Sequence, residues 1–418
     1  MTPTSTPTAP ATAGVTEHRG ALAQVVLATL ASAVGFWAWM IISPLASTYR
    51  EWMSLDSAQQ SLVIATPVLV GSLGRIVVGA MTDRFGARRM FVVILLLPVP
   101  AVIAVMIGGV LTSFWLLLVA GFFLGIAGTI FAIGIPFASA WFPPQRRGLA
   151  NGIFGMGMIG TAVSAFLTPR LVSWIGYVPT HLVVIGLMIV TAAVVWFTMK
   201  ESPSWQPSKA KLVPKVAGAL RLPVTWQMCF LYGIVFGGFV AFSTYLPTYL
   251  KDVYDVGLAG AGARTAGFAV VAVVLRPIGG VLADRVGPWL ITCFSLTAVA
   301  VLAFLVSLRP AGEIPTGTIF LLMAGALGLG MGAVFAWVPR RAPADRVGAV
   351  TGVVAAAGGL GGYFPPLIMG ATYDPAARSY AIGLWLLVAT SLVALVFTLI
   401  VMRPRRTSAE AGESPAEA

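Results

Sequence analysis

Two arginines lie inside long apolar stretches of the sequence, at equivalent places in a repeated motif. Residues 75–86 read RIVVGAMTDRFG and residues 276–287 read RPIGGVLADRVG, so Arg75 and Arg276 are related by an offset of 201 residues. Each arginine precedes the motif's aspartate by eight residues, which is about 12 Å along a helix. In a membrane, an arginine at that depth costs about 2.5–3.5 kcal/mol and needs a compensating partner.

The expected partner of these arginines is a small anion. All 14 Asp and Glu residues fall in loops, tails or the ends of apolar stretches, so no carboxylate is available inside. A guanidinium group is planar and presents paired donors, which suits a planar oxyanion such as nitrate, nitrite or a carboxylate. The alternative is a structural tie, in which each arginine pairs with a buried carboxylate or with backbone carbonyls.

Other kinds of chemistry lack the residues they need. Cys229 and Cys293 stand singly in apolar runs, and neither His18 nor His181 has ligand-spaced neighbours. We therefore expect no metal site, no catalytic cluster and no cofactor, and the chain is not expected to be an enzyme. Residues 155–160 match the spacing of a dinucleotide fingerprint, but they follow no strand and lie in an apolar stretch, so we reject that interpretation.

Composition identifies the elements that hold the arginines. Of 418 residues, 58% are apolar and 10% charged, and the formal charge is +12, whereas soluble proteins average about 25% charged residues. This predicts an all-α membrane protein with twelve transmembrane helices, each about 20 residues or longer. The predicted spans are 21–46, 60–82, 90–110, 114–141, 149–174, 180–199, 224–250, 264–283, 289–308, 316–338, 348–372 and 380–402.

The motif repeat divides these spans into two six-helix bundles. We expect a disordered N-terminal tail at 1–20, bundles at 21–199 and 224–402, a linker at 200–223 and a C-terminal tail at 403–418. If both termini face the cytoplasm, 18 of the 26 Lys and Arg residues lie on that side and six on the other. This asymmetry predicts that both termini, and the linker, are cytoplasmic.

The repeated motif and the six-plus-six arrangement resemble the major facilitator superfamily across the whole chain. More narrowly, the chain resembles the nitrate/nitrite porter family, which has an Arg eight residues before the loop Asp in both halves. Other matching features are the Gly-rich segments 152–160 and 352–362, the aromatic segment 231–243 and the segment 131–144, which begins Phe-Ala and ends Phe-Pro. Met158 is a departure, because the family usually has Asn there.

The resemblance implies roles for particular residues. It implies that Phe131, Tyr232 and Phe236 sandwich the anion between the arginines, although ordinary packing is an equally good interpretation of aromatic residues. It also implies substrate-site roles for Gly157, Gly160, Gly358 and Gly361, whereas their spacing indicates close helix packing. It finally implies that the residues at the ends of spans two and eight form a gate; these are Asp83, Arg84, Asp284 and Arg285.

The resulting functional hypothesis is a secondary transporter of nitrate, nitrite or both, working by alternating access in the inner (plasma) membrane. Two like charges resist closure when no anion is bound, so exchange of anions is the first choice of mechanism. Proton-coupled nitrate symport and carriage of another small anion, such as an organic carboxylate, are the alternatives. The expected partners are the anion and the lipid bilayer; the chain is expected to be a monomer, and nucleic-acid binding is excluded because the basic residues are scattered.

Overall fold

The computed structural model describes residues 19–143, 146–203, 205–207, 212–310, 313–343 and 346–403. Within them, twelve helical stretches are long and apolar enough to cross a membrane. Spans one to six consist of α1 (Ala21–Trp39), η1 (Ser43–Leu45) and α2 (Ala46–Met53); α3 (Ser57–Phe85); α4 (Ala87–Leu96) and α5 (Val99–Val110); α6 (Phe114–Leu124), η2 (Gly125–Ile130) and α7 (Phe131–Trp141); α8 (Arg147–Gly155), η4 (Met156–Met158) and α9 (Ile159–Ile175); and α10 (Tyr177–Thr198). Spans seven to twelve are α12 (Pro223–Tyr254); α13 (Leu258–Val286); α14 (Pro288–Ser307); α15 (Glu313–Arg341); α16 (Val347–Gly361) with α17 (Phe364–Ala371); and α18 (Ala381–Ile400).

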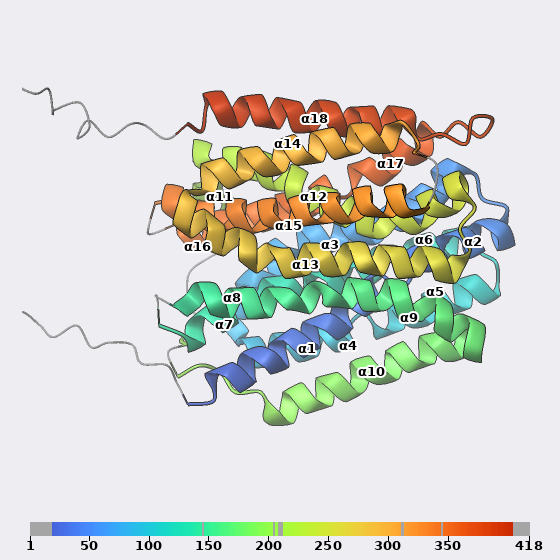
Figure 1. The fold of residues 1–418 in the computed structure, drawn as a ribbon. Coiled ribbons are helices and arrows are strands. Elements are labelled where there is room, and N and C mark those ends of the chain that lie inside the picture. The colour runs from blue at the N-terminus through green and yellow to red at the C-terminus, as the bar shows by residue number, and fades with distance from the viewer. Residues whose placement is uncertain are drawn as a thin grey trace, which may run out of the picture.

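The helices run roughly parallel to one another, and the start of α1 and the end of α18 lie at the same end of the bundle (Figure 1). We call this end the termini side and the opposite end, where α2 and α12 end, the far side. The all-α membrane fold expected from the sequence is confirmed. The expected tails fall almost wholly on residues 1–18 and 404–418, which lie outside the described residues.

Local sequence signals start and stop the helices that carry the two arginines. Asp56 caps α3, since its carboxylate accepts from the backbone N–H of Gln59 at 2.7 Å and the Gln59 side chain accepts from the Asp56 N–H at 3.1 Å. Gly86 and Gly287 end α3 and α13 with φ of 87° and 96°, a conformation that favours glycine. The glycines of the repeated motif therefore fix where each arginine-bearing helix stops.

The linker contains a helix that the sequence analysis did not anticipate. α11 (Leu212–Leu220) precedes α12 and packs against α16. Earlier in the linker, Glu201 accepts a hydrogen bond from the backbone N–H of Arg88 at 2.7 Å. A Cβ on Gly86 would lie 2.5 Å from the Glu201 carboxylate, so this glycine also allows the linker to approach the end of α3.

The first half of the chain (spans one to six) packs closely against the second half (spans seven to twelve). The two arginine-bearing helices, α3 and α13, both take part in this packing. α3 packs on α16 and α17, and α9 packs on α13. A Cβ on Gly359 would lie 2.2 Å from Ser72, and one on Gly262 would lie 2.3 Å from the carbonyl oxygen of Ala165. Small residues at these crossings let the backbones approach closely, as is typical of membrane helices. The helix faces turned away from the core expose large apolar side chains, such as Trp115 and Phe197, as expected for contact with lipid.

Candidate functional site

Arg75 of α3 is buried at the interface between the halves, with 3% of its surface exposed. One of its terminal nitrogens, Nη1, donates to the carbonyl oxygen of Ala355 in α16 at 3.0 Å. Its Nε, which is also buried, has no hydrogen-bond partner. Arg75 therefore matches the structural-tie alternative in part, because it bonds a backbone carbonyl, but it retains an unsatisfied donor.

Arg276 of α13 is similarly buried, with 8% exposed, but its contacts differ. Its Nη2 donates to the Tyr232 hydroxyl at 3.1 Å, and its Nη1 contacts the sulfur of Met158 at 2.9 Å. A thioether is a weak acceptor, so this nitrogen is poorly satisfied. Met158 belongs to η4 in the other half, so a residue of the glycine-rich segment 152–160 touches the arginine directly.

The two guanidinium groups face the same two aromatic rings. The Arg75 guanidinium carbon lies 5.5 Å from the Phe131 ring centroid and 5.2 Å from that of Phe236. For Arg276 the corresponding distances are 5.0 and 5.9 Å. Tyr232 stacks on Phe236 at 5.0 Å, with an angle of 10° between the rings. These five residues come from α3, α7, α12 and α13, and we call them the central cluster.

The central cluster juxtaposes the residues that the sequence analysis selected for the anion. Cation–π contact lowers the cost of burying each charge, and the hydrogen-bond partners of the two arginines within the described residues are a carbonyl, a hydroxyl and a sulfur rather than carboxylates. Two positive groups with unsatisfied or weakly satisfied donors form a site that favours a small anion. Phe335, whose ring centroid lies 5.6 Å from the Arg276 guanidinium, adds a wall that the sequence analysis missed.

The four glycines predicted for the substrate site occupy packing positions. A Cβ on Gly157 or Gly160 would lie 2.8 or 2.0 Å from α1, and one on Gly361 would lie 2.0 Å from the Gly233 carbonyl oxygen in α12. A Cβ on Gly358 would lie 2.3 Å from the Tyr232 ring. Gly358 therefore gives the tyrosine room to stack beside Arg276, while contact of any of these glycines with substrate stays a prediction.

The residues predicted to form a gate lie on the termini side. Asp284 pairs with Arg340 of its own half at 2.7 Å, and Arg84 lies 5.4 Å over the Phe85 ring. Asp83 lines a small cavity of about 30 Å³ beside the linker residue Glu201. Arg285 is exposed. The contacts described for Asp83, Arg84 and Asp284 are within one half or with the linker, so their gating role stays a prediction.

A second cross-half cluster, on the far side, was missed by the sequence analysis. Arg50 of α2 pairs with Asp252 of α12 at 3.3 Å, and Lys251 pairs with Glu51. The hydroxyl of Tyr380 donates to Asp252; burial raises the pKa of Tyr380, so it stays protonated and keeps donating at neutral pH. We call Arg50, Glu51, Lys251, Asp252 and Tyr380 the far-side cluster.

The sequence does contain a signal for the far-side cluster. Arg50-Glu51 and Lys251-Asp252 are both basic-acidic dipeptides, and they are separated by the same offset of 201 residues that relates Arg75 to Arg276. The hydroxyl of Ser43 also bonds the carbonyl oxygen of Thr244, again 201 residues away. Extending the repeat beyond its best-matched motif would have identified these pairs.

Comparisons with known proteins agree with this architecture. The family model of the Major Facilitator Superfamily matches residues 28–366. A Mycobacterium tuberculosis protein named "Probable nitrate/nitrite transporter NarK2" is 54% identical over 385 residues, covering 92% of this chain and 98% of that protein. The nitrite extrusion protein of Bacillus subtilis is 37% identical over 378 residues, covering 90% of this chain and 93% of that protein.

Among solved structures, a bacterial homolog to the human lysosomal transporter Spinster, in an inward-facing and occupied conformation, has a similar fold. Its TM-score is 0.69 at 20% identity, and the match covers 96% of this chain and 100% of that chain. At this identity, the likeness concerns the fold alone.

Proposed function

Because this chain belongs to the Major Facilitator Superfamily and to its nitrate/nitrite porters, we propose that it is a nitrate/nitrite transporter that exchanges these anions by alternating access. It is a multi-pass membrane protein and not an enzyme. We further propose that it acts in the inner (plasma) membrane with both termini cytoplasmic, which would make the termini side the cytoplasmic side.

We propose that the central cluster binds the anion. One observation carries this assignment: two buried arginines from opposite halves face the same two rings, and Arg75 Nε has no partner. An oxyanion between them would accept from Arg75 Nε and from the Arg276 nitrogen now held by the Met158 sulfur. The flat rings of Phe131 and Phe236 would confine a small planar anion and exclude water from it.

Exchange follows from the charge of this cluster. Without an anion, the two guanidinium groups repel each other in a medium of low dielectric constant, where repulsion is strong. A bound anion removes that repulsion and lets the halves pass through a closed state. Return without an anion is disfavoured, so each half-cycle requires a substrate, and the flux of one anion is tied to counterflow of another.

The far-side cluster supports a cycle in which this side is closed while the other opens. Its ion pairs join α2 to α12 and so hold the two halves together on the far side. Ser61 and Tyr245 add a hydrogen bond between the halves at 3.0 Å. We propose that these contacts break when the far side opens and that the motif aspartates Asp83 and Asp284 then tie the termini side.

Counterflow in proteoliposomes tests this mechanism. Vesicles loaded with nitrite should take up external nitrate rapidly, and vesicles without internal anion should not. Uptake that ignores internal nitrite and follows an imposed proton gradient would replace exchange with proton-coupled symport. Inhibition of counterflow by acetate or formate as effectively as by unlabelled nitrate would instead indicate a carrier of small carboxylates.

A further inference from the structure

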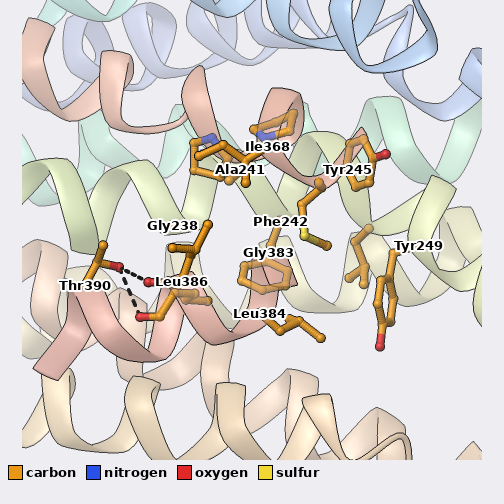
Figure 2. Close-up of a pocket in the computed structure, with 15 residues that line it drawn as sticks. Gly238, Ala241, Phe242, Tyr245, Tyr249, Ile368, Gly383, Leu384, Leu386 and Thr390 are labelled. Atoms are coloured by element: carbon orange, nitrogen blue, oxygen red, sulfur yellow. Dashed lines mark hydrogen bonds between the residues drawn. The ribbon is translucent and has the colours of Figure 1, made fainter. Parts of the chain in front are cut away.

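An apolar pocket of about 120 Å³ lies between α12, α17 and α18, distinct from the central cluster. Figure 2 shows Phe242 and Gly383 near its middle, with residues of the three helices around them. The residues that the inference uses are Ala241, Tyr245, Met369, Leu386, Leu387 and Thr390. The pocket lies in the far-side half of the bundle, because α18 begins on that side and the five residues that it contributes all lie between positions 383 and 390.

Three side-chain hydroxyls belong to the lining, those of Thr390, Tyr245 and Tyr249. The buried Tyr249 hydroxyl has no hydrogen-bond partner among the described residues and points away from the other residues labelled in Figure 2. The hydroxyl of Thr390 donates to the carbonyl oxygens of Leu386 and Leu387 at 2.8 and 3.1 Å, as drawn in Figure 2. The Tyr245 hydroxyl points away from the other labelled residues in that view and pairs with Ser61 of the other half. The pocket therefore offers an apolar ligand mainly carbon surfaces, because its hydroxyls are bonded elsewhere or, at Tyr249, point away from the other labelled residues.

The pocket adjoins an exposed apolar face of α18. Leu386, on its rim, is 44% exposed, and its neighbours Ile382 and Trp385 on α18 are also exposed. Apolar cavities of roughly 150 Å³ stay dry and bind apolar molecules. In a bilayer, the apolar material that surrounds this face of α18 is lipid hydrocarbon.

Two arginines lie at the far-side ends of α14 and α18, the same side of the bundle as the pocket. Arg309 follows α14, and Arg378 lies in the loop before α18, so both are on the far side. Arg309 Nη1 donates to the carbonyl oxygen of Ala377, adjacent to Arg378, at 2.7 Å. Both side chains are exposed and belong to the few basic residues on this side. Lipid phosphate and anionic headgroups are attracted to such basic positions.

We propose that this pocket binds an acyl chain of an anionic phospholipid of the far-side leaflet, whose phosphate contacts Arg309 and Arg378. The bound chain packs against Tyr245, which bonds Ser61 across the two halves, so the lipid stabilises the far-side closure. This assignment is independent of the anion that the protein transports.

Photo-crosslinking in vesicles tests the proposal without any transport assay. The probe is a phosphatidylglycerol carrying a diazirine in its acyl chain, and crosslinked peptides are mapped by mass spectrometry. Labelling should concentrate on α12, α17 and α18, and A241L, which fills the pocket, should reduce it by about fivefold or more. The matched control A389L adds the same bulk on the exposed face of α18 and should leave labelling unchanged. Labelling spread evenly over lipid-facing helices, or unchanged in A241L, overturns the proposal.

Two further arms complete the test. L387F fills the pocket from α18 and replaces A241L if that variant does not fold. A phosphatidylcholine with the same diazirine-bearing acyl chain serves as the second probe. The unaltered protein should prefer the phosphatidylglycerol probe, and the double variant R309Q/R378Q should remove that preference. Equal labelling by the two probes in the unaltered protein would overturn the headgroup contact.

Discussion

The central and far-side clusters are built by one repeat, yet they carry opposite charge patterns. An offset of 201 residues relates Arg75 to Arg276 in the central cluster. The same offset relates Arg50 to Lys251 and Glu51 to Asp252 in the far-side cluster. In the central cluster, the residues related by the repeat carry the same charge. On the far side, each basic residue of one dipeptide pairs with the acidic residue of the other dipeptide, Arg50 with Asp252 and Lys251 with Glu51.

Because of this difference, the two clusters differ in what they need in order to hold the two halves together. The far-side cluster contains both signs of charge, so it joins the halves without any ligand. The central cluster contains two positive groups that face the same rings, and in the proposed mechanism its closure requires an added negative charge. Under that proposal, one repeat supplies a far-side closure that needs no ligand and a central closure that depends on substrate.

The largest effect is expected from replacing the central arginines with lysine. R75K and R276K keep the positive charge but lose the planar fork of donors. A hydrogen bond to a charged group contributes about 1.5–3 kcal/mol, so nitrate/nitrite counterflow should fall by about 10- to 150-fold in each variant. Counterflow in proteoliposomes measures this.

The control for the central arginines is R170K, which makes the same change at Arg170 in α9. Arg170 bonds the carbonyl oxygen of Phe166 in its own helix, away from the cluster. Counterflow by R170K should match that of the unaltered protein. Normal counterflow in both R75K and R276K would show that a point charge suffices and that the paired donors are not used.

Breaking the far-side cluster should move the equilibrium between the closed and open far side. Asp252 has only 12% of its side chain exposed and accepts from both Arg50 and Tyr380. D252N removes the charge, which we expect to cost about 1.5 kcal/mol and to raise the open population by about tenfold. The readout is alkylation by a charged maleimide of S61C, a position buried between the halves, with Cys229 and Cys293 replaced by serine.

Two variants decide whether the D252N effect comes from the ion pair. D255N makes the same change at an exposed aspartate three residues away and should not alter the alkylation rate. The charge exchange R50D/D252R should restore slow alkylation, because it reverses the pair without removing it. Fast alkylation in R50D/D252R would assign closure to another contact of Asp252, the hydrogen bond that it accepts from Tyr380.

The sequence predicted the spans and the central arginines because both depend on local rules. Twelve apolar stretches follow from the cost of unsatisfied backbone groups in lipid, and Arg75 and Arg276 stand out because charge is rare there. The shared rings were predicted only through a family resemblance, since Phe131 and Phe236 are 105 residues apart and nothing local pairs them. The contact between Met158 and Arg276 could not be predicted, because it depends on how closely η4 and α13 approach.

Backbone irregularities also escaped the sequence analysis. The fourth and fifth spans change to 3₁₀ geometry at Gly125–Ile130 and Met156–Met158, and the eleventh is divided after Gly361. Glycine spacing predicted close helix packing but not these local changes, because each depends on the helix that packs against it. The latter two changes lie in the glycine-rich segments, where short irregular helix often marks a hinge.

A smaller effect is expected at Met158, whose sulfur contacts Arg276. M158N would place an asparagine amide against Arg276. The amide oxygen would accept a hydrogen bond from the guanidinium, and the amide N–H groups would face the anion. A neutral hydrogen bond contributes about 0.5–1.5 kcal/mol, so the half-saturating nitrate concentration should fall by about two- to tenfold. Concentration-dependent counterflow measures it, and M156N is the matched control in the same turn, where Met156 is 39% exposed. An unchanged half-saturating concentration in M158N would place the anion away from this residue.

The smallest effect is expected from the second far-side ion pair. Comparing it with the Arg50–Asp252 pair tests how solvent exposure of the side chains changes the contribution of an ion pair to closure. Lys251 and Glu51 form the counterpart of the Arg50–Asp252 pair, but their side chains are 32% and 65% exposed. Water screens such a pair, and exposed pairs contribute about 0.2–1 kcal/mol, so K251A should raise S61C alkylation by less than about fivefold. The same assay as for D252N applies, at low and high salt. An effect of K251A equal to that of D252N would mean that the two pairs act as one unit, and that the far side closes by net charge rather than through the buried pair.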